Sequence, residues 1–388
     1  MKYGRGFPAV RRTPLWNFFM SICMNRPSTR ACSLGIAAVA CLLAAPAFAG
    51  RVNYEMVPVG DPGNASSSSG YGAVNYSYQI GKYEVTIGQF TAFLNAVAKD
   101  DPYHIYYNPN WAVSGPLVGI AQSGEAGSYS YSAMTPVGVN PAGANSPENR
   151  PIGEITWFQA ARFANWMTNG QGTGDTETGA YTLIDFQRQG LAPEKNPGAK
   201  FYIPTEDEWY KAAYYKGGGL DSGYWLFPTR SDSTPGNTIG GSNDVNTTEL
   251  RDRVKYFAVT QSSDNNWNQN YLTDVGAFTG SYGPYGTFDQ GGNLAEWNDL
   301  SGAASGTRGV SGTYWDQVTF GTGNWIRWND LPAGAQAFCL GFRLAGPAAA
   351  PVPEIAPSSF GSAFVLLIGG LGWVERRTRR AVGPRTAA

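Results

Sequence analysis

The chain has 388 residues, of which 42% are hydrophobic and 15% are charged, so it can bury a sizeable core and is not a disordered tail. Its formal net charge of -1 conceals an uneven distribution, because residues 50–350 hold 17 Lys/Arg against 27 Asp/Glu, a net charge of -10. An acidic surface of this kind repels phosphate backbones, which argues against binding to nucleic acid through a basic patch.

Histidine and cysteine are too scarce for several common metal sites. The chain has one histidine, His104, and residues 50–350 contain one cysteine, Cys339. Zinc sites built from Cys and His, metal centres with two His from one chain, and a disulfide within residues 50–350 are therefore excluded. His104 has tyrosines close to it on both sides, where a packed or surface histidine is a better interpretation than a catalytic base.

Residues 1–49 have the features of a secretory leader. An apolar run, Ser33–Phe48, follows Arg26 and Arg30 and is closed by Ala47-Phe48-Ala49, with small residues at its first and third positions. This order predicts a signal peptide that is cleaved after Ala49. A membrane anchor is the alternative, although the run is short for a span of about 20 residues. A start at Met24 in place of the first methionine would give a leader of more ordinary length.

Residues 50–350 are rich in Gly, Asn, Ser, Thr and aromatic residues, which predicts short elements joined by long ordered loops. Three helices are predicted from one pattern, a Thr followed three residues later by Gln or Glu, which satisfies free amides of the first turn. These pairs are Thr86 with Gln89, Thr156 with Gln159, and Thr205 with Glu208. The region 114–149 is predicted to be a long Gly/Ser loop.

Five segments in this order resemble the formylglycine-generating enzyme family, also called the sulfatase-modifying factor domain. They are Tyr83–Phe90, Pro151–Trp157, Phe201–Trp209, Gly291–Trp297 and Gly341–Ala345. Together they span nearly all of residues 50–350. The resemblance implies a single α+β domain with a C-type lectin-like fold, low regular secondary structure and structural calcium.

The resemblance also identifies where the chemistry of the family would lie. Active members oxidise a cysteine of a sulfatase to formylglycine, using oxygen and two cysteines that hold Cu(I), which prefers soft thiolates. The family pattern places these cysteines at Asp316 and Gly321, after the matching stretch Ser311–Trp315. Copper is therefore not expected, and no catalytic residue is predicted. Cys339 supplies only half of the ligand set and precedes a predicted core strand, where a buried, inert thiol is expected.

A calcium site is a further implication of the resemblance. Its ligands would be the side chains of Asp289 and Glu296 and the backbone carbonyls of Gly292 and Leu294. Hard carboxylate and carbonyl oxygens suit Ca²⁺, and the consecutive glycines allow the chain to turn tightly. The alternative is a Gly-rich turn before a buried tryptophan. A second family site for calcium would fall near residues 246–247.

Residues 351–388 resemble a PEP-CTERM sorting signal. Pro353 and Glu354 are followed by the apolar run Phe360–Val374 and then by a cluster of four arginines within residues 375–380. Ile355 stands where this motif usually has its second proline. The resemblance implies exosortase-type sorting machinery as a partner and membrane association through one short helix, with the arginines on the cytoplasmic side. A buried core helix is the alternative.

Two functions follow from this partition into residues 1–49, 50–350 and 351–388. The first is an exported, calcium-stabilised domain at the envelope or outer surface of a Gram-negative bacterium, which binds an unknown peptide, glycan or envelope partner. The second is a formylglycine-generating-type oxidase or related enzyme that modifies exported proteins. The sequences Trp297–Asp299 and Trp328–Asp330 resemble the Trp-Asn-Asp motif of calcium lectins, although three-residue matches are common.

Overall fold

The computed structural model describes residues 51–106, 119–135, 146–184, 188–266, 268–325 and 327–349. The chain divides into two compact units, Met1–Ala47 and Phe48–Ala388, and every described residue belongs to the second. The predicted leader and the predicted sorting tail lie outside the described residues. Within the described ranges, no helix is both long enough and apolar enough to cross a membrane.

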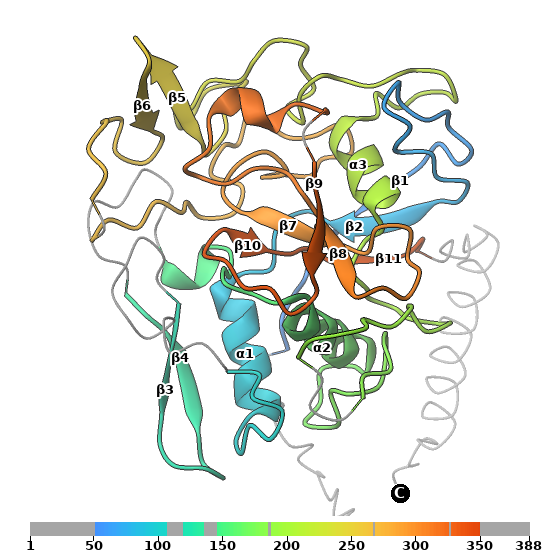
Figure 1. The fold of residues 1–388 in the computed structure, drawn as a ribbon, viewed down its shortest axis with the longest axis vertical. Helices are drawn as coiled ribbons and strands as arrows, with labels where there is room; N and C mark the ends of the chain where they lie inside the picture. Colours follow the sequence, from blue (N-terminus) through green and yellow to red (C-terminus); the bar gives the residue numbers. More distant parts are fainter. Residues whose placement is uncertain are drawn as a thin grey trace, which may run out of the picture. The chain divides into compact units, whose positions relative to one another are not determined.

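A three-stranded antiparallel sheet joins the two ends of the domain. It has the order β1 (Met56–Val59), β2 (Tyr78–Gly81) and β11 (Ala345–Pro347), and Ile80 of the central strand is opposite Ala345. Because β11 comes from the last described segment, this sheet closes the domain on itself (Figure 1).

A second sheet has the order β10 (Leu340–Gly341), β7 (Ala295–Asn298), β8 (Thr307–Ser311) and β9 (Trp328–Pro332). The β10–β7 pair is parallel and the other pairs are antiparallel. Two hairpins complete the strands, β3 (Ile120–Ser123) with β4 (Ser130–Ala133), and β5 (Thr248–Arg251) with β6 (Val254–Phe257).

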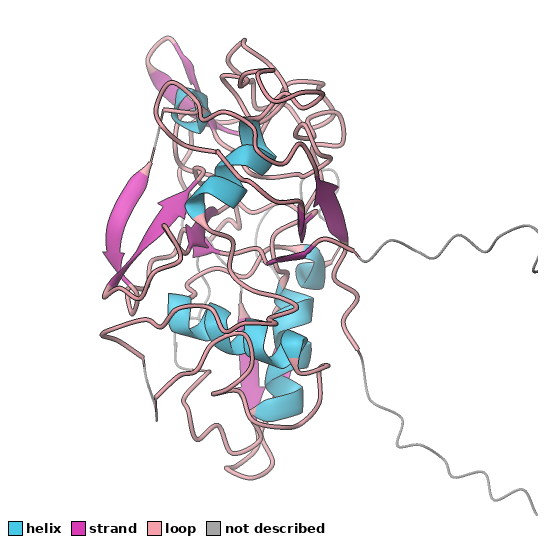
Figure 2. Ribbon diagram, turned by 90° about the vertical axis from the view of Figure 1, so that its right-hand side faces the viewer, coloured by secondary structure: helices cyan, strands magenta, loops and turns pink. Residues whose placement is uncertain are grey.

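The three predicted helices are present, and each begins at its predicted threonine. They are α1 (Ile87–Val97), α2 (Trp157–Thr168) and α3 (Glu206–Tyr214), each with both hydrogen bonds of a capping box. Two short 3₁₀ turns, η2 (Pro147–Asn149) and η3 (Thr319–Thr322), lie in the loops. Figure 1 shows α1 and α2 on one side of the central strands and α3 on the other, and Figure 2 shows how much of the domain is loop.

The core between α1 and α2 is aromatic. Phe90 of α1 stacks on Phe163 of α2 with ring centroids 5.8 Å apart, and Phe163 also meets Phe342 edge to face at 5.6 Å. All three rings are fully buried, and burial of each contributes roughly 2–3 kcal/mol. Phe342 follows β10, so these contacts connect the helices to the second sheet and fix the loops that follow its strands.

The predicted long loop over residues 114–149 is wrong in part. Its described portion contains the β3–β4 hairpin and η2, while residues 136–145 are outside the described set. Tyr131 fixes the hairpin against α1, because its hydroxyl donates to the carbonyl of Ala98 at 2.7 Å. Asn95 of α1 also pairs with the Tyr131 backbone in both directions. These long-range bonds, and not local propensity, select the hairpin.

Candidate functional site

The two positions that the family resemblance assigns to the copper ligands, Asp316 and Gly321, lie before and in η3. Asp316 is partly exposed, and its carboxylate lies 3.3 Å from the Lys255 ammonium. Lys255 also donates to the Asp316 carbonyl at 2.7 Å. Gly321 lies within η3, where an added Cβ would be 3.2 Å from the Thr313 methyl. The two positions therefore offer one lysine-paired carboxylate and no second side chain.

Cys339 is the one cysteine of residues 50–350. It is partly buried and packs at the edge of the main core, directly before β10, so it is less buried than predicted. Burial raises the pKa of its thiol from 9.0 to about 11. The thiol is therefore protonated at neutral pH, and a protonated thiol is a poor nucleophile and a poor metal ligand.

The predicted calcium loop is a tight turn with three residues at positive φ. They are Asp289 at 60°, Gly292 at 104° and Asn293 at 62°. A Cβ on Gly292 would lie 2.5 Å from the carbonyl oxygen of Asn246, so only glycine fits there. The turn is held by Asn293, whose side-chain oxygen accepts from the Asn246 amide at 2.9 Å and from the Thr273 backbone at 3.2 Å.

Glu296 accepts hydrogen bonds from two side chains of the domain, one charged and one neutral. Its two carboxylate oxygens pair with the Arg343 guanidinium, each at 2.6 Å, and one of them also accepts from the Trp209 indole at 2.9 Å. Glu296 and Arg343 are both fully buried. The fork-to-fork geometry is that of a strong charge-assisted pair. Both carboxylate oxygens of Glu296 are therefore already hydrogen-bonded, and Arg343 competes with a calcium ion for them.

Asp289 is the other acidic residue of the predicted ligand set. One of its oxygens accepts from the backbone amide of Gly276 at 2.6 Å, and burial raises its pKa from 3.8 to about 6. Among the residues that the structure describes, no three or more His, Cys, Asp or Glu side chains gather as they would around a metal ion. Arg343 therefore competes with calcium for Glu296, and the calcium site remains a prediction.

Glu84 is the acidic residue that the sequence reasoning did not single out. It is buried, and its carboxylate accepts from the Leu294 backbone and from the Asn293 amide, both at 3.1 Å. Burial, followed by the nearby carboxylates of Asp289 and Glu296, raises its pKa well above the usual value. The signal that could have indicated this role was a charged residue between the apolar Tyr83 and Val85.

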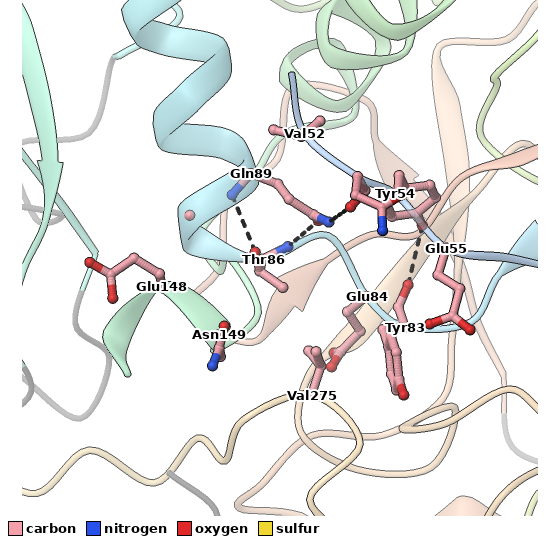
Figure 3. Close-up of a pocket in the computed structure, with 12 residues that line it drawn as sticks. Val52, Tyr54, Glu55, Tyr83, Glu84, Thr86, Gln89, Glu148, Asn149 and Val275 are labelled. Carbon is pink, nitrogen blue, oxygen red and sulfur yellow. Dashed lines mark hydrogen bonds between the residues drawn. The ribbon is translucent and has the colours of Figure 1, made fainter. Parts of the chain in front are cut away.

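A pocket of about 370 Å³ lies beside this network. Figure 3 shows Glu84 near Tyr83 and Val275, with the capping box of α1 on the opposite side. Its charged lining is entirely acidic, Glu55, Glu84 and Glu148. Glu55 forms an exposed ion pair with Lys82 at 2.9 Å, which leaves the pocket acidic at its buried end.

His104 lines a separate polar pocket of about 420 Å³ with Arg162, Arg188 and Gln336. It is exposed, in a turn at φ 49°, which agrees with a surface histidine. Arg162 is itself held by a buried bidentate pair with Glu177, at 2.6 and 2.7 Å. The charge of Arg162 is therefore already compensated within the domain.

The first Trp-Asn-Asp sequence is part of the core. The Trp297 indole donates to the Ile155 carbonyl at 2.6 Å. Asp299 accepts from the Trp157 indole and the Tyr181 hydroxyl, both at 2.7 Å, and pairs with Arg308 at 3.0 Å. This motif therefore has a packing role. The side chains of the second motif are outside the described set.

These features define an α+β domain of short strands, three capped helices and long ordered loops, in which the Gly-Gly-Asn turn is tied to a buried ion network. The chain belongs to the FGE-sulfatase family, the sulfatase-modifying factor enzyme 1-like domain, whose model matches residues 67–346.

Three solved structures are similar to this chain. Treponema denticola variable protein 1 is 20% identical with a TM-score of 0.41, covering 77% of this chain and 96% of its own. CarF is 18% identical with a TM-score of 0.42, covering 76% and 99%. PvdO from Pseudomonas aeruginosa is 14% identical with a TM-score of 0.36, covering 76% and 92%. No curated protein matches the chain.

Proposed function

We propose that this chain is an exported binding domain with a C-type lectin-like fold that has lost the copper oxidase chemistry of its family. One observation carries the proposal. The positions that the family resemblance assigns to the two copper ligands hold Asp316 and Gly321, and Asp316 is paired with Lys255. A hard carboxylate and a glycine cannot replace two soft thiolates around Cu(I).

The remaining cysteine does not supply a substitute. Cys339 has a pKa of about 11, so forming its thiolate at pH 7 costs roughly 5 kcal/mol before any metal binds. A second thiolate would still be needed for the linear dithiolate coordination of the family, and residues 50–350 contain no other cysteine. The domain therefore keeps the fold of the family while its redox centre is missing.

Export is supported by the sequence at both ends. The leader over residues 1–49 and the sorting tail over residues 351–388 favour an envelope or surface protein that is handled by exosortase-type machinery. Calcium stabilisation through Asp289, Gly292, Leu294 and Glu296 stays a prediction. The Arg343 pair weighs against it, because a calcium ion would share the Glu296 carboxylate with a buried guanidinium of the same charge sign.

A titration with Cu(I) tests the loss of oxidase activity. The purified chain is titrated without oxygen in competition with bicinchoninate, and oxygen uptake is then measured with a sulfatase-derived cysteine peptide. We expect no tight Cu(I) uptake and no oxygen consumption, for the wild type and for Cys339→Ser alike. Stoichiometric Cu(I) binding that Cys339→Ser abolishes, or peptide-dependent oxygen uptake, would overturn the proposal and favour the alternative, a formylglycine-generating-type or related protein-modifying enzyme.

A further inference from the structure

A groove runs along the domain where the loop before β2, the first turn of α3 and the loop after β7 meet. It consists of two adjoining pockets of about 470 and 420 Å³, which share Tyr76, Thr205 and Ser301 in their linings. Asn75 and Asp207 line the first pocket only, and Glu194 and Lys195 line the second only. We call this the Tyr76 groove.

Tyr76 is the exposed aromatic residue between the two pockets. Its side chain is 45% exposed, and its hydroxyl donates to a carboxylate oxygen of Glu208 at 3.0 Å. Glu208 is fully buried, and the same oxygen accepts from the Tyr202 hydroxyl at 2.9 Å. Its other oxygen accepts from the Thr205 backbone at 2.8 Å, within the capping box of α3. A buried carboxylate therefore fixes the orientation of the Tyr76 ring, which lowers the entropy cost of binding against it.

The two tyrosines of the groove have different roles. The Lys195 ammonium lies 3.4 Å from the centroid of the Tyr202 ring, and Tyr202 is only 4% exposed. Tyr202 is therefore a positioning residue. Tyr76 leaves part of its ring open to the groove, where a ligand can stack on it.

The groove wall next to Tyr76 is polar and held in place. Asp207 accepts from the Gly72 amide at 2.8 Å, and the Asn64 amide donates to the Gly72 carbonyl at 2.8 Å. The Gly72–Asp207 bond attaches the loop before β2 to the start of α3, and the Asn64–Gly72 bond holds that loop together. Asn75 and Ser301 are exposed, so their amide and hydroxyl groups face solvent beside the aromatic ring.

We infer that the Tyr76 groove binds a neutral oligosaccharide, with a sugar ring stacked on Tyr76 and its hydroxyls bonded by Asn75, Asp207 and Ser301. A pyranose has one apolar C–H face and a rim of hydroxyls, which matches an aromatic ring among amide, hydroxyl and carboxylate groups. Asp207 and Glu194 outnumber Lys195 in the lining, and residues 50–350 carry a net charge of -10, which disfavours sulfated or uronic glycans. The inference rests on the proposed binding function and names its ligand class.

Calorimetric titration of the full chain with cellohexaose, maltohexaose and chitohexaose tests the inference, with a heparin hexasaccharide as the anionic probe. We expect at least one neutral hexasaccharide to bind and the heparin fragment not to bind. Tyr76→Ala should weaken the affinity by about tenfold or more, because the stacking ring is lost. Tyr76→Phe keeps the ring and loses only the bond to Glu208, so it should retain most of the affinity. Melting curves of the variants check that each is folded.

Phe320→Ala is the matched control, because Phe320 is 57% exposed and lies outside the groove, in η3 beside Gly321. It should bind like the wild type. Loss of binding in Phe320→Ala with normal binding in Tyr76→Ala would overturn the groove while leaving a binding function at η3. Failure of all three neutral probes, or stronger binding of the heparin fragment, would also overturn it. The copper titration does not involve Tyr76, so its result stands separately.

Discussion

The buried pair between Glu296 and Arg343 supports a quantitative prediction. Glu296→Gln keeps the shape of the side chain but leaves the guanidinium without a counter-charge. Arg343 also donates to the carbonyls of Gly81 at 3.0 Å and Phe288 at 2.7 Å, so it is anchored and cannot reach solvent by a simple rotation. Removing one partner of a fully buried ion pair costs about 3–5 kcal/mol, and we expect the unfolding free energy to fall by that amount.

Urea unfolding at pH 7, followed by tryptophan fluorescence, measures this loss. Glu55→Gln is the matched control, because it breaks the Glu55–Lys82 pair, in which the two side chains are 53% and 26% exposed. An exposed pair contributes about 0–1 kcal/mol, so the control should unfold almost as the wild type does. If Glu296→Gln cost no more than Glu55→Gln, the reasoning would be refuted, because Arg343 would then have found water or another partner.

The same urea unfolding experiment, repeated with calcium and with a chelator, tells the ion pair from a calcium site. A ligand that binds only the folded chain stabilises it by RT ln(1 + [L]/Kd), which is about 2.7 kcal/mol at a hundredfold excess over Kd. A calcium site that includes Glu296 predicts that the chelator lowers the unfolding free energy of the wild type, whereas a Glu296 held by Arg343 alone predicts the same curve in both conditions. A chelator-dependent loss that Glu296→Gln removes would instead show that Glu296 is a calcium ligand.

Two further predictions concern the same loop. The pKa of Asp289 is raised from 3.8 to about 6 in the folded chain, so between these pH values the folded state holds a proton that the unfolded state releases. The free energy of unfolding of the wild type therefore falls as pH rises from about 4 to 6. The amide side chain of the Asp289→Asn variant cannot titrate, so the unfolding free energy of the variant relative to the wild type should rise by roughly 3 kcal/mol between pH 4 and pH 7. Urea unfolding at the two pH values measures this, and a difference that stays constant would contradict it. Gly292→Ala should cost at least about 2 kcal/mol, because its Cβ would meet Asn246 at φ 104°. Gly306→Ala, whose Cβ meets nothing within 4 Å, should leave the melting temperature nearly unchanged, and equal losses would refute the steric argument.

The helix starts could be predicted from the sequence because their physics is local. Each capping box joins residues three positions apart, so the pattern of Thr156 and Gln159 contains all the information that its two hydrogen bonds need. The fold could be predicted from the family resemblance, which depends on five sequence segments that occur in the same order. Neither source depends on knowing which distant residues meet.

The ion network could not be predicted because its partners are far apart in the chain. Glu296 and Arg343 are separated by 47 residues, and Glu84 and Asn293 by 209. In the sequence, a carboxylate in a Gly-rich turn is equally consistent with a calcium ligand and with one member of an ion pair. Only the structure shows which group lies next to it. The β3–β4 hairpin was missed for the same reason, since Asn95 of α1 holds Tyr131 across 36 residues.

The region around the two positions that the family resemblance assigns to the copper ligands is held by contacts within the chain. Trp315 stacks on Tyr271 with ring centroids 4.6 Å apart, and the Tyr214 hydroxyl of α3 donates to the Thr322 carbonyl at 3.0 Å. On another part of the surface, Glu208 both closes the capping box of α3 and orients Tyr76. A residue in the first turn of a helix therefore also shapes the groove, so a binding surface on this domain can depend on the same bonds that fold it.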